Sequence, residues 1–113
     1  MLAKENRLTK DKEFEKVFKT GRSSYGKLLG IKAVANELPD SRFGILVGIK
    51  VSKKAVERNK IKRRIREAIR ARLENVKKGF DVVVITLPEI LGKDYSEIER
   101  ELENNLKRLR IVK

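Results

Sequence analysis

Apolar residues recur along this chain with two periods, which predict three strands and three helices. Alternating or nearly continuous apolar runs indicate strands, and apolar positions three and four residues apart indicate helices. The strands are predicted over residues 25–35, 42–51 and 80–87, and the helices over residues 4–20, residues 51–76 and the segment from Asp94 onward.

The run over residues 80–87 has the strongest strand pattern. Its sequence FDVVVITL contains three consecutive valines, which predicts a central strand buried on both faces. Pro88 is expected to end it. The run FGILVGIKV, within residues 42–51, is also almost continuously apolar. A buried position in the sheet is therefore expected for this strand too.

The first helix is predicted to be short and amphipathic. Thr9 is its expected N-cap and Gly21 its expected stop. Phe14, Val17 and Phe18 share one face by their i, i+3 and i+4 spacing, and lysines surround them. Two roles are open for the phenylalanines: core residues, or a platform on which unpaired bases stack.

The last helix is predicted to be acidic on its outer side. Residues 89–103 carry 6 acidic and 2 basic side chains, so this helix is expected to pack on the core and face water rather than nucleic acid. Asp94 is its expected N-cap, with Glu97 as the capping-box partner. The buried stripe is predicted to contain Tyr95, Ile98, Leu102, Leu106 and Leu109.

The most basic part of the chain is residues 51–72, VSKKAVERNKIKRRIREAIRAR. Residues 50–78 carry 13 basic and 3 acidic side chains, whereas a solvated helical surface usually approaches neutrality. Helical spacing gathers a packing side from Ile61, Ile65, Ala68, Ile69, Arg72, Leu73 and Val76. The opposite arc holds Asn59, Lys62, Arg63, Arg66 and Arg70, and it is expected to bind a polyanion.

The composition narrows the class of function. The chain has 113 residues, a formal charge of +13, no cysteine and no histidine. The length fits a single domain over residues 1–113. The charge favours nucleic acid as the partner, and the missing imidazole and thiol groups remove most hydrolytic and metal-site templates. A membrane is the second candidate partner, but no apolar run approaches the roughly 20 residues of a spanning helix. Docking on a membrane surface is not expected either, because the apolar side of the basic helix has no Trp or Phe and is needed to cover a sheet. With no hydrophobic signal region at the N-terminus, a cytoplasmic protein is expected.

Residues 21–27, GRSSYGK, match the first seven positions of a phosphate-binding loop. The position that requires Ser or Thr is Leu28, so the hydroxyl group that would hold magnesium is missing. The context is inverted as well, because a predicted helix precedes this segment and a predicted strand follows it. Nucleotide hydrolysis is therefore not expected.

Three stretches together resemble the protein component of bacterial ribonuclease P. The most specific is FGILVGIKVSKKAVERNKIKRRIRE, residues 43–67, with its Arg-Asn-x-x-Lys-Arg core. The sequence GFDVVVI, residues 79–85, resembles the last strand of the family. The family's N-terminal helix is matched by Asn6, Arg7, Leu8, Phe14, Val17, Phe18 and Gly21.

The resemblance implies a fold and two sets of binding residues. The fold is an α/β sandwich with a mixed sheet of about four strands and three helices, like the second domain of a small-subunit ribosomal protein. The crossover through the basic helix is left-handed in the family, opposite to the usual hand. The catalytic RNA is expected to contact Lys53, Lys54, Arg58, Asn59, Lys60, Lys62, Arg63, Arg64 and Arg66. The single-stranded 5′ leader of precursor tRNA is expected between the first helix and the sheet, at Phe14, Phe18, Lys10 and Lys32.

The resemblance also implies a division of chemistry. The RNA subunit and its magnesium ions carry the endonuclease reaction, the hydrolysis of one phosphodiester bond, so no catalytic or metal-binding residue is expected in the protein. A monomeric protein would raise substrate affinity and lower the magnesium requirement, because each Lys or Arg that neutralises a phosphate replaces condensed cations.

Departures from the family pattern and other functions bear on this interpretation. The chain departs from the pattern at Lys60, Gly48, Ile49 and Leu87, which weakens the expected leader contacts on the sheet most. A ribosomal or ribosome-assembly RNA-binding protein, with no preference for a leader, is the alternative. DNA binding is not expected, because no helix-turn-helix pair is predicted.

Overall fold

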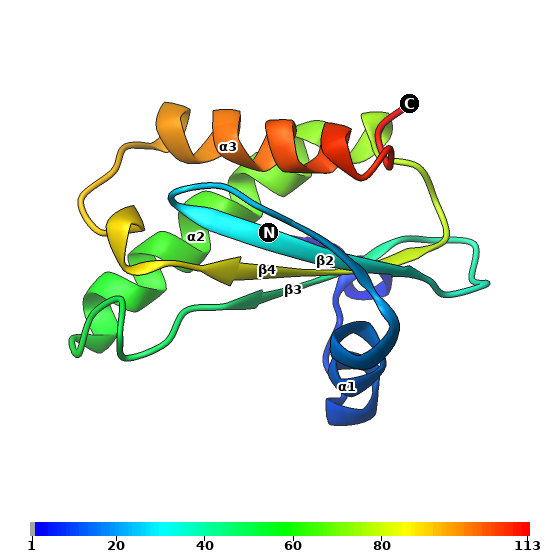
Figure 1. Ribbon diagram of the computed structural model, residues 1–113, viewed down its shortest axis with the longest axis horizontal. Coiled ribbons are helices and arrows are strands. Elements are labelled where there is room, and N and C mark those ends of the chain that lie inside the picture. Colours follow the sequence, from blue (N-terminus) through cyan, green and yellow to red (C-terminus); the bar gives the residue numbers. More distant parts are fainter. Residues whose placement is uncertain (1) are drawn as a thin grey trace.

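The chain forms a four-stranded mixed sheet with helices on both faces (Figure 1). The computed structural model describes residues 2–113. The strands are β1 (Arg22–Tyr25), β2 (Leu29–Ala35), β3 (Arg42–Leu46) and β4 (Phe80–Thr86). The α-helices are α1 (Asp11–Thr20), α2 (Ala55–Arg72) and α3 (Tyr95–Arg108), and the 3-10 helices are η1 (Lys4–Asn6), η2 (Leu73–Asn75) and η3 (Pro88–Ile90). The sandwich of three helices and a mixed sheet is confirmed.

The central strand is β4, as predicted. The strand order is β1-β2-β4-β3, with β4 antiparallel to β2 and parallel to β3. Val82 and Val84 pack in the main core, whereas Val83 packs with Leu8 and Val17 on the other face. The burial of β4 on both faces is therefore confirmed.

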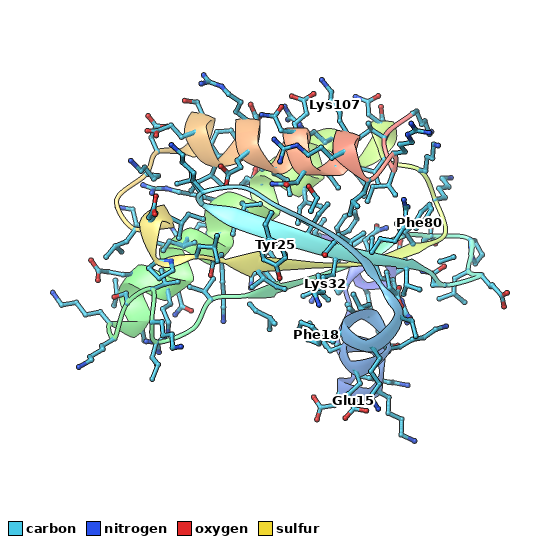
Figure 2. All side chains as sticks on the ribbon, viewed as in Figure 1. Glu15, Phe18, Tyr25, Lys32, Phe80 and Lys107 are labelled. Atoms are coloured by element: carbon cyan, nitrogen blue, oxygen red, sulfur yellow. The ribbon has the colours of Figure 1, made fainter. Side chains whose placement is uncertain are left out.

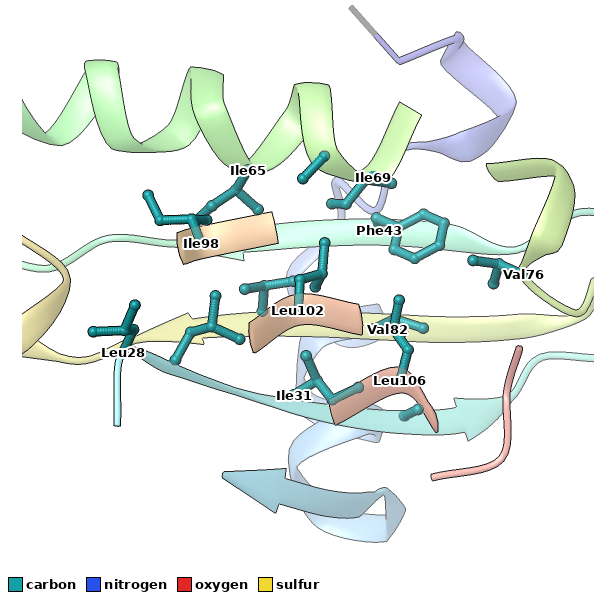
Figure 3. Packing of buried hydrophobic residues seen from close by; sticks show 14 of the residues in the cluster. Leu28, Ile31, Phe43, Ile65, Ile69, Val76, Val82, Ile98, Leu102 and Leu106 are labelled. Atoms are coloured by element: carbon teal, nitrogen blue, oxygen red, sulfur yellow. The ribbon is translucent and has the colours of Figure 1, made fainter. Parts of the chain in front are cut away.

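The main core lies between the sheet and the pair formed by α2 and α3 (Figures 1 and 3). Asp94 caps α3 by accepting a hydrogen bond from the Glu97 backbone N–H at 2.9 Å. Tyr95 is half-buried against the cluster. The residues that meet in this core include Ile31, Phe43, Val82, Ile65, Ile69, Ile98, Leu102 and Leu106. The predicted packing sides of both long helices are thus confirmed.

The strand predicted over residues 42–51 is shorter and lies at an edge of the sheet. It ends at Leu46, and β3 is the last strand in the order. The expected interior position was wrong, because the apolar run covers the two faces of an edge strand. Phe43 faces the main core, and Gly44 lies under the ring of Phe14. The free edge is partly covered, since the Phe43 carbonyl accepts from the Leu8 backbone N–H at 2.9 Å.

The single strand predicted over residues 25–35 is instead the second half of a hairpin. β1 pairs antiparallel with β2, from Arg22 opposite Ala33 to Tyr25 opposite Gly30. The segment that matched a phosphate-binding loop therefore contains an edge strand. Its turn is held by the Glu101 carboxylate of α3, which accepts hydrogen bonds from the backbone N–H groups of Lys27, Leu28 and Leu29.

The first helix begins later than predicted. Residues 4–6 form the separate helix η1, and the N-cap of α1 is Lys10 rather than Thr9. The Glu13 carboxylate explains this start, because it accepts from the backbone N–H groups of Lys10 at 3.0 Å and Thr9 at 3.3 Å. Gly21 ends α1 as predicted, and a Cβ there would lie 2.4 Å from the Val17 carbonyl oxygen.

Candidate nucleic-acid interface

The outer side of α2 is a row of polar and cationic side chains, which we call the basic face: Asn59, Lys62, Arg63, Arg66 and Arg70. Lys62 is half-buried and the others are exposed. The buried residues Ile61, Ile65 and Ile69 hold the opposite side of the helix on the sheet. Because one helix carries both sides, packing of the isoleucines fixes the direction of the cations.

Three cations of the basic face are unpaired. Within residues 2–113, the side chains of Lys62, Arg63 and Arg66 make no ion pair or hydrogen bond. Lys60, Lys53 and Lys54 are also exposed, the last two just before α2 begins. The positive charge of these groups is therefore balanced by solvent ions, which a polyanion displaces.

Two other predicted RNA contacts also hold loops in place. Arg58 Nη1 donates to the Ser52 carbonyl at 2.9 Å, and Arg64 Nη1 donates to the Lys93 carbonyl at 2.6 Å. Both residues are half-buried. Each of these arginines therefore uses one of its hydrogen-bond donors for a contact within the protein.

Arg70 and Arg72 have acidic partners. Arg70 lies 3.1 Å from the Glu67 carboxylate, and its hydrogen bond lowers the pKa of Glu67. Arg72 contacts Glu99 at 3.1 Å and Glu103 at 2.9 Å on α3. Burial works against the charge of Arg72, but the two carboxylates outweigh it and raise its pKa. Arg72 thus joins α2 to α3, on the packing side as predicted.

The two phenylalanines of α1 have different surroundings. Phe14 is half-buried, and a Cβ on Gly44 would come within 2.5 Å of its ring. Phe18 is 40% exposed. Lys32 Nζ lies 5.7 Å from the centroid of the Phe18 ring, within the range of a cation–π contact (Figure 2). One ring therefore packs on the sheet, and the other is available to a ligand.

Tyr25 adds a second exposed ring to the same face of the sheet. It is 45% exposed, and its ring lies over Gly30, where a Cβ would come within 2.2 Å. Gly30 and Lys32 point to one face because strand residues alternate. Tyr25 was not among the predicted contacts. The sequence feature that could have indicated this contact is Gly30, two residues before Lys32. A glycine at this position of the strand leaves room for a ring.

Arg42 fixes the start of α1 to the sheet, and no pattern in the sequence indicated it. Its Nε and Nη2 lie 2.8 and 2.7 Å from the two carboxylate oxygens of Asp81. Nη1 donates to Glu13. The hydrogen bonds that Arg42 donates to Asp81 are the main cause of its raised pKa. They outweigh burial, which lowers the pKa. Burial opposes the charge of Glu13 as well, but the N–H groups of Lys10 and Thr9, together with Arg42, lower its pKa.

Two hollows flank the N-terminal segment. The larger, of about 700 Å³, is lined by Lys10, Glu13 and Arg42 among others. The smaller, of about 380 Å³, lies where residues 2–9, β3 and α2 meet. We call it the edge hollow, and its lining includes Leu8, Phe14, Gly44, Ile45, Lys62 and Arg66.

The predicted leader residues are therefore not gathered in one place. Phe18 and Lys32 are in contact, Phe14 lines the edge hollow, and Lys10 lines the larger hollow.

Among residues 2–113, no helix is long and apolar enough to cross a membrane.

Comparisons with known proteins agree over almost the whole chain. Residues 2–110 match the family model described as Ribonuclease P. The Ribonuclease P protein component of Clostridium botulinum is 41% identical over 106 residues, which are 93% of this chain and 95% of that protein. The RNase P protein of Staphylococcus aureus superposes with a TM-score of 0.87 at 29% identity, covering 96% of this chain and 98% of that one. The RNase P protein from Thermotoga maritima gives a TM-score of 0.82 at 35% identity, covering 90% and 96% of the two chains.

Proposed function

The chain belongs to the Ribonuclease P protein family, and from this membership we propose that it is the protein subunit of a ribonuclease P that removes the 5′ leader from precursor tRNA. One copy binds the catalytic RNA in the cytoplasm, and the RNA carries the chemistry. The observation that carries this proposal is the unpaired cations of the basic face, Lys62, Arg63 and Arg66, on a helix whose other side is core.

The basic face suits the folded catalytic RNA. Arginine presents a planar group that matches phosphate oxygens in pairs, and lysine supplies a point charge. Arg63 and Arg66 lie three residues apart and are exposed, so they reach neighbouring phosphates along one strand. Asn59 adds an uncharged donor and acceptor one turn earlier.

The sheet face beside α1 suits a single strand. Phe18 and Tyr25 offer exposed rings on which unpaired bases stack. Lys32 lies next to the Phe18 ring, where it neutralises a phosphate of the same strand. These are the features that a leader of variable sequence requires, because every base has a flat face.

The RNA subunit offers better ligands for magnesium ions than this chain does. Protein-bound Mg²⁺ takes carboxylate oxygens together with phosphates, and the basic face offers cations instead. Among residues 2–113, no three His, Cys, Asp or Glu side chains gather as a metal site. In this proposal the phosphates of the RNA subunit hold the magnesium ions, and the protein lowers the amount required.

The proposal is tested by cleavage of precursor tRNA with a bacterial ribonuclease P RNA at low magnesium, with and without the protein. We expect stimulation that is lost when the leader is trimmed to one nucleotide. Stimulation independent of the leader would contradict leader binding on the sheet face beside α1. Tight RNA binding without stimulation would favour a ribosomal or ribosome-assembly protein.

Phe18→Ala is expected to weaken binding of leader-bearing precursor tRNA to the holoenzyme. The loss of one stacked base costs about 1–3 kcal/mol, or roughly 5- to 150-fold in affinity. Affinities are measured for substrates with a long leader and with a leader of one nucleotide. Leu91→Ala is the control, because Leu91 is 43% exposed but belongs to the loop before α3. Equal losses for both substrates would remove Phe18 from the leader site.

A further inference from the structure

Helix α3 holds the β1–β2 hairpin at three places, although no RNA is assigned to this helix. Arg22 Nη2 donates to the Leu109 carbonyl at 2.9 Å. The Ser24 hydroxyl donates to Asn105 Oδ1 at 2.7 Å. The turn between the two strands donates to the carboxylate of Glu101. The three acceptors, on α3 and its C-cap, are four residues apart, so they form one line along the helix that faces the hairpin.

The contact of Glu101 with the turn is the most concentrated of the three. Its carboxylate accepts from three consecutive backbone N–H groups, with distances of 3.1 Å for Lys27 and 2.6 Å for Leu29, and with Leu28 between them. Gly26 lies against the same group, because a Cβ there would come within 2.6 Å of Glu101 Cδ. Among residues 2–113, no cation forms an ion pair with Glu101. The backbone N–H groups of the turn therefore stabilise its negative charge.

The hairpin carries Tyr25 on the opposite face of the sheet. Side chains alternate along a strand, so Arg22 and Ser24 point toward α3 and Tyr25 points away from it. Tyr25 is opposite Gly30 in the ladder, and its ring lies over that glycine. Figure 2 shows Tyr25 on the side of the sheet that carries Lys32. The ring therefore borders the surface assigned above to the leader, whereas the contacts that hold its strand lie on the other face.

Strand β1 has little support besides these contacts. It is an edge strand of 4 residues, paired on one side with β2. None of its residues is buried or belongs to a hydrophobic cluster of the described chain. Tyr25 is its last residue, and Gly26 begins the turn. The direction of the Tyr25 side chain therefore depends on the conformation of the turn that Glu101 holds.

We propose that Glu101 is a positioning residue for precursor tRNA: it holds the turn so that the Tyr25 ring lies over Gly30, where an unpaired base stacks on it. The inference rests on the proposed function, in which Tyr25 offers a ring to the leader. Glu101 contacts no RNA, because α3 covers the other face of the sheet (Figure 1). An acidic side chain serves RNA binding in this way without approaching the phosphates.

NMR of the protein in phosphate buffer tests the geometry. An aromatic ring shifts the resonances of protons beneath it, so the α-protons of Gly30 report the position of the Tyr25 ring. Glu101→Gln keeps the length of the side chain, but its NH2 group cannot accept from the turn. We expect the ring-current shift of Gly30 to be lost in this variant. A shift that persists would overturn the proposal.

Glu97→Gln is the matched control for the NMR measurement. It removes the same charge from α3 one turn earlier, where the carboxylate lies 3.9 Å from Lys93 in an exposed pair. The ring-current shift of Gly30 is expected to stay unchanged in this variant. Loss of the shift in both variants would overturn the proposal, because the charge of α3 would then matter rather than the contact with the turn.

A double-mutant cycle tests the link to substrate binding, with the holoenzyme and precursor tRNA that has a long leader. We expect Tyr25→Ala to weaken binding about tenfold, as the loss of one stacked base does. Glu101→Gln should weaken it about fivefold, since the ring remains but is no longer held. After Tyr25→Ala, adding Glu101→Gln should change the affinity by less than about twofold, because no ring is left to position.

Three controls accompany the cycle. Affinities for ribonuclease P RNA and for precursor tRNA with a leader of one nucleotide are expected to stay within about twofold in every variant, which shows that the variants fold. Gly26→Ala disturbs the same contact from the turn, because its Cβ would displace the Glu101 carboxylate. It is expected to reproduce the loss seen in Glu101→Gln.

The outcomes separate this inference from the proposed function. Losses that multiply in the double variant, or that are equal for both leader lengths, would overturn the positioning role. If Tyr25→Ala weakens binding of the long leader and Glu101→Gln does not, the positioning role alone fails. If Tyr25→Ala leaves this binding unchanged, the leader contact of Tyr25 fails and the positioning role fails with it.

Discussion

Replacement of both Arg63 and Arg66 by alanine is expected to weaken binding to ribonuclease P RNA about 60-fold at 0.1 M salt. Each phosphate contact releases about 0.9 condensed counter-ion, so two lost contacts reduce the slope of log affinity against log salt by about 1.8. Both side chains are exposed and make no ion pair or hydrogen bond within residues 2–113. Their removal therefore leaves the protein's own contacts intact.

The measurement is the RNA affinity of the double variant over a series of salt concentrations. Arg100→Ala with Lys113→Ala is the matched control, because it removes the same charge from exposed positions in or after the acidic helix α3. We expect a nearly unchanged slope for this control. An unchanged slope for the Arg63 and Arg66 variant would remove this part of α2 from the RNA contact.

Arg42→Met is expected to lower the free energy of unfolding by about 3 kcal/mol. The Asp81 side chain is only 3% exposed and receives two hydrogen bonds from Arg42. Without the guanidinium group, Asn36 Nδ2 at 2.9 Å is its remaining side-chain donor within residues 2–113. A buried carboxylate left in this state is costly because it has lost both water and its counter-charge.

Urea unfolding measures this loss. Arg70→Met is the matched control, because its ion pair with Glu67 is exposed, and pairs of that kind contribute about 0–1 kcal/mol. Adding Asp81→Asn to Arg42→Met removes the uncompensated charge and should restore part of the stability. Equal losses for Arg42→Met and Arg70→Met would show that burial of Asp81 adds nothing to the pair.

Periodicity correctly predicted which residues of β4, α2 and α3 are buried. The valines of β4 and the apolar stripes of α2 and α3 lie where their spacing indicated. Spacing reports which faces are buried, but it does not report which strand lies beside which. The apolar run at Phe43 therefore predicts an interior strand. In the structure the strand lies at an edge, and Phe14 and Leu8 cover its second face.

The sequence patterns did not predict contacts between residues that are far apart in the chain. Arg42 and Asp81 meet because β3 and β4 are neighbours in register. The position of α1 depends on Glu13, which contacts Arg42 of the sheet. Within the candidate site, charge pattern and resemblance indicated the basic face. They did not indicate Tyr25 on the open face, nor that Arg58 and Arg64 also hold loops.

The support of the β1–β2 turn by Glu101 has a consequence for biosynthesis. The three N–H donors of the turn precede their acceptor by 72 to 74 residues. A nascent chain that ends before α3 contains every residue assigned to RNA, but its hairpin turn is hydrated and its main core lacks Ile98, Leu102 and Leu106. Long-range contacts of this kind form late, since a large loop must close first. The folded arrangement of the residues assigned to RNA therefore arises only after α3 has been synthesised, and it depends on a helix assigned no RNA contact.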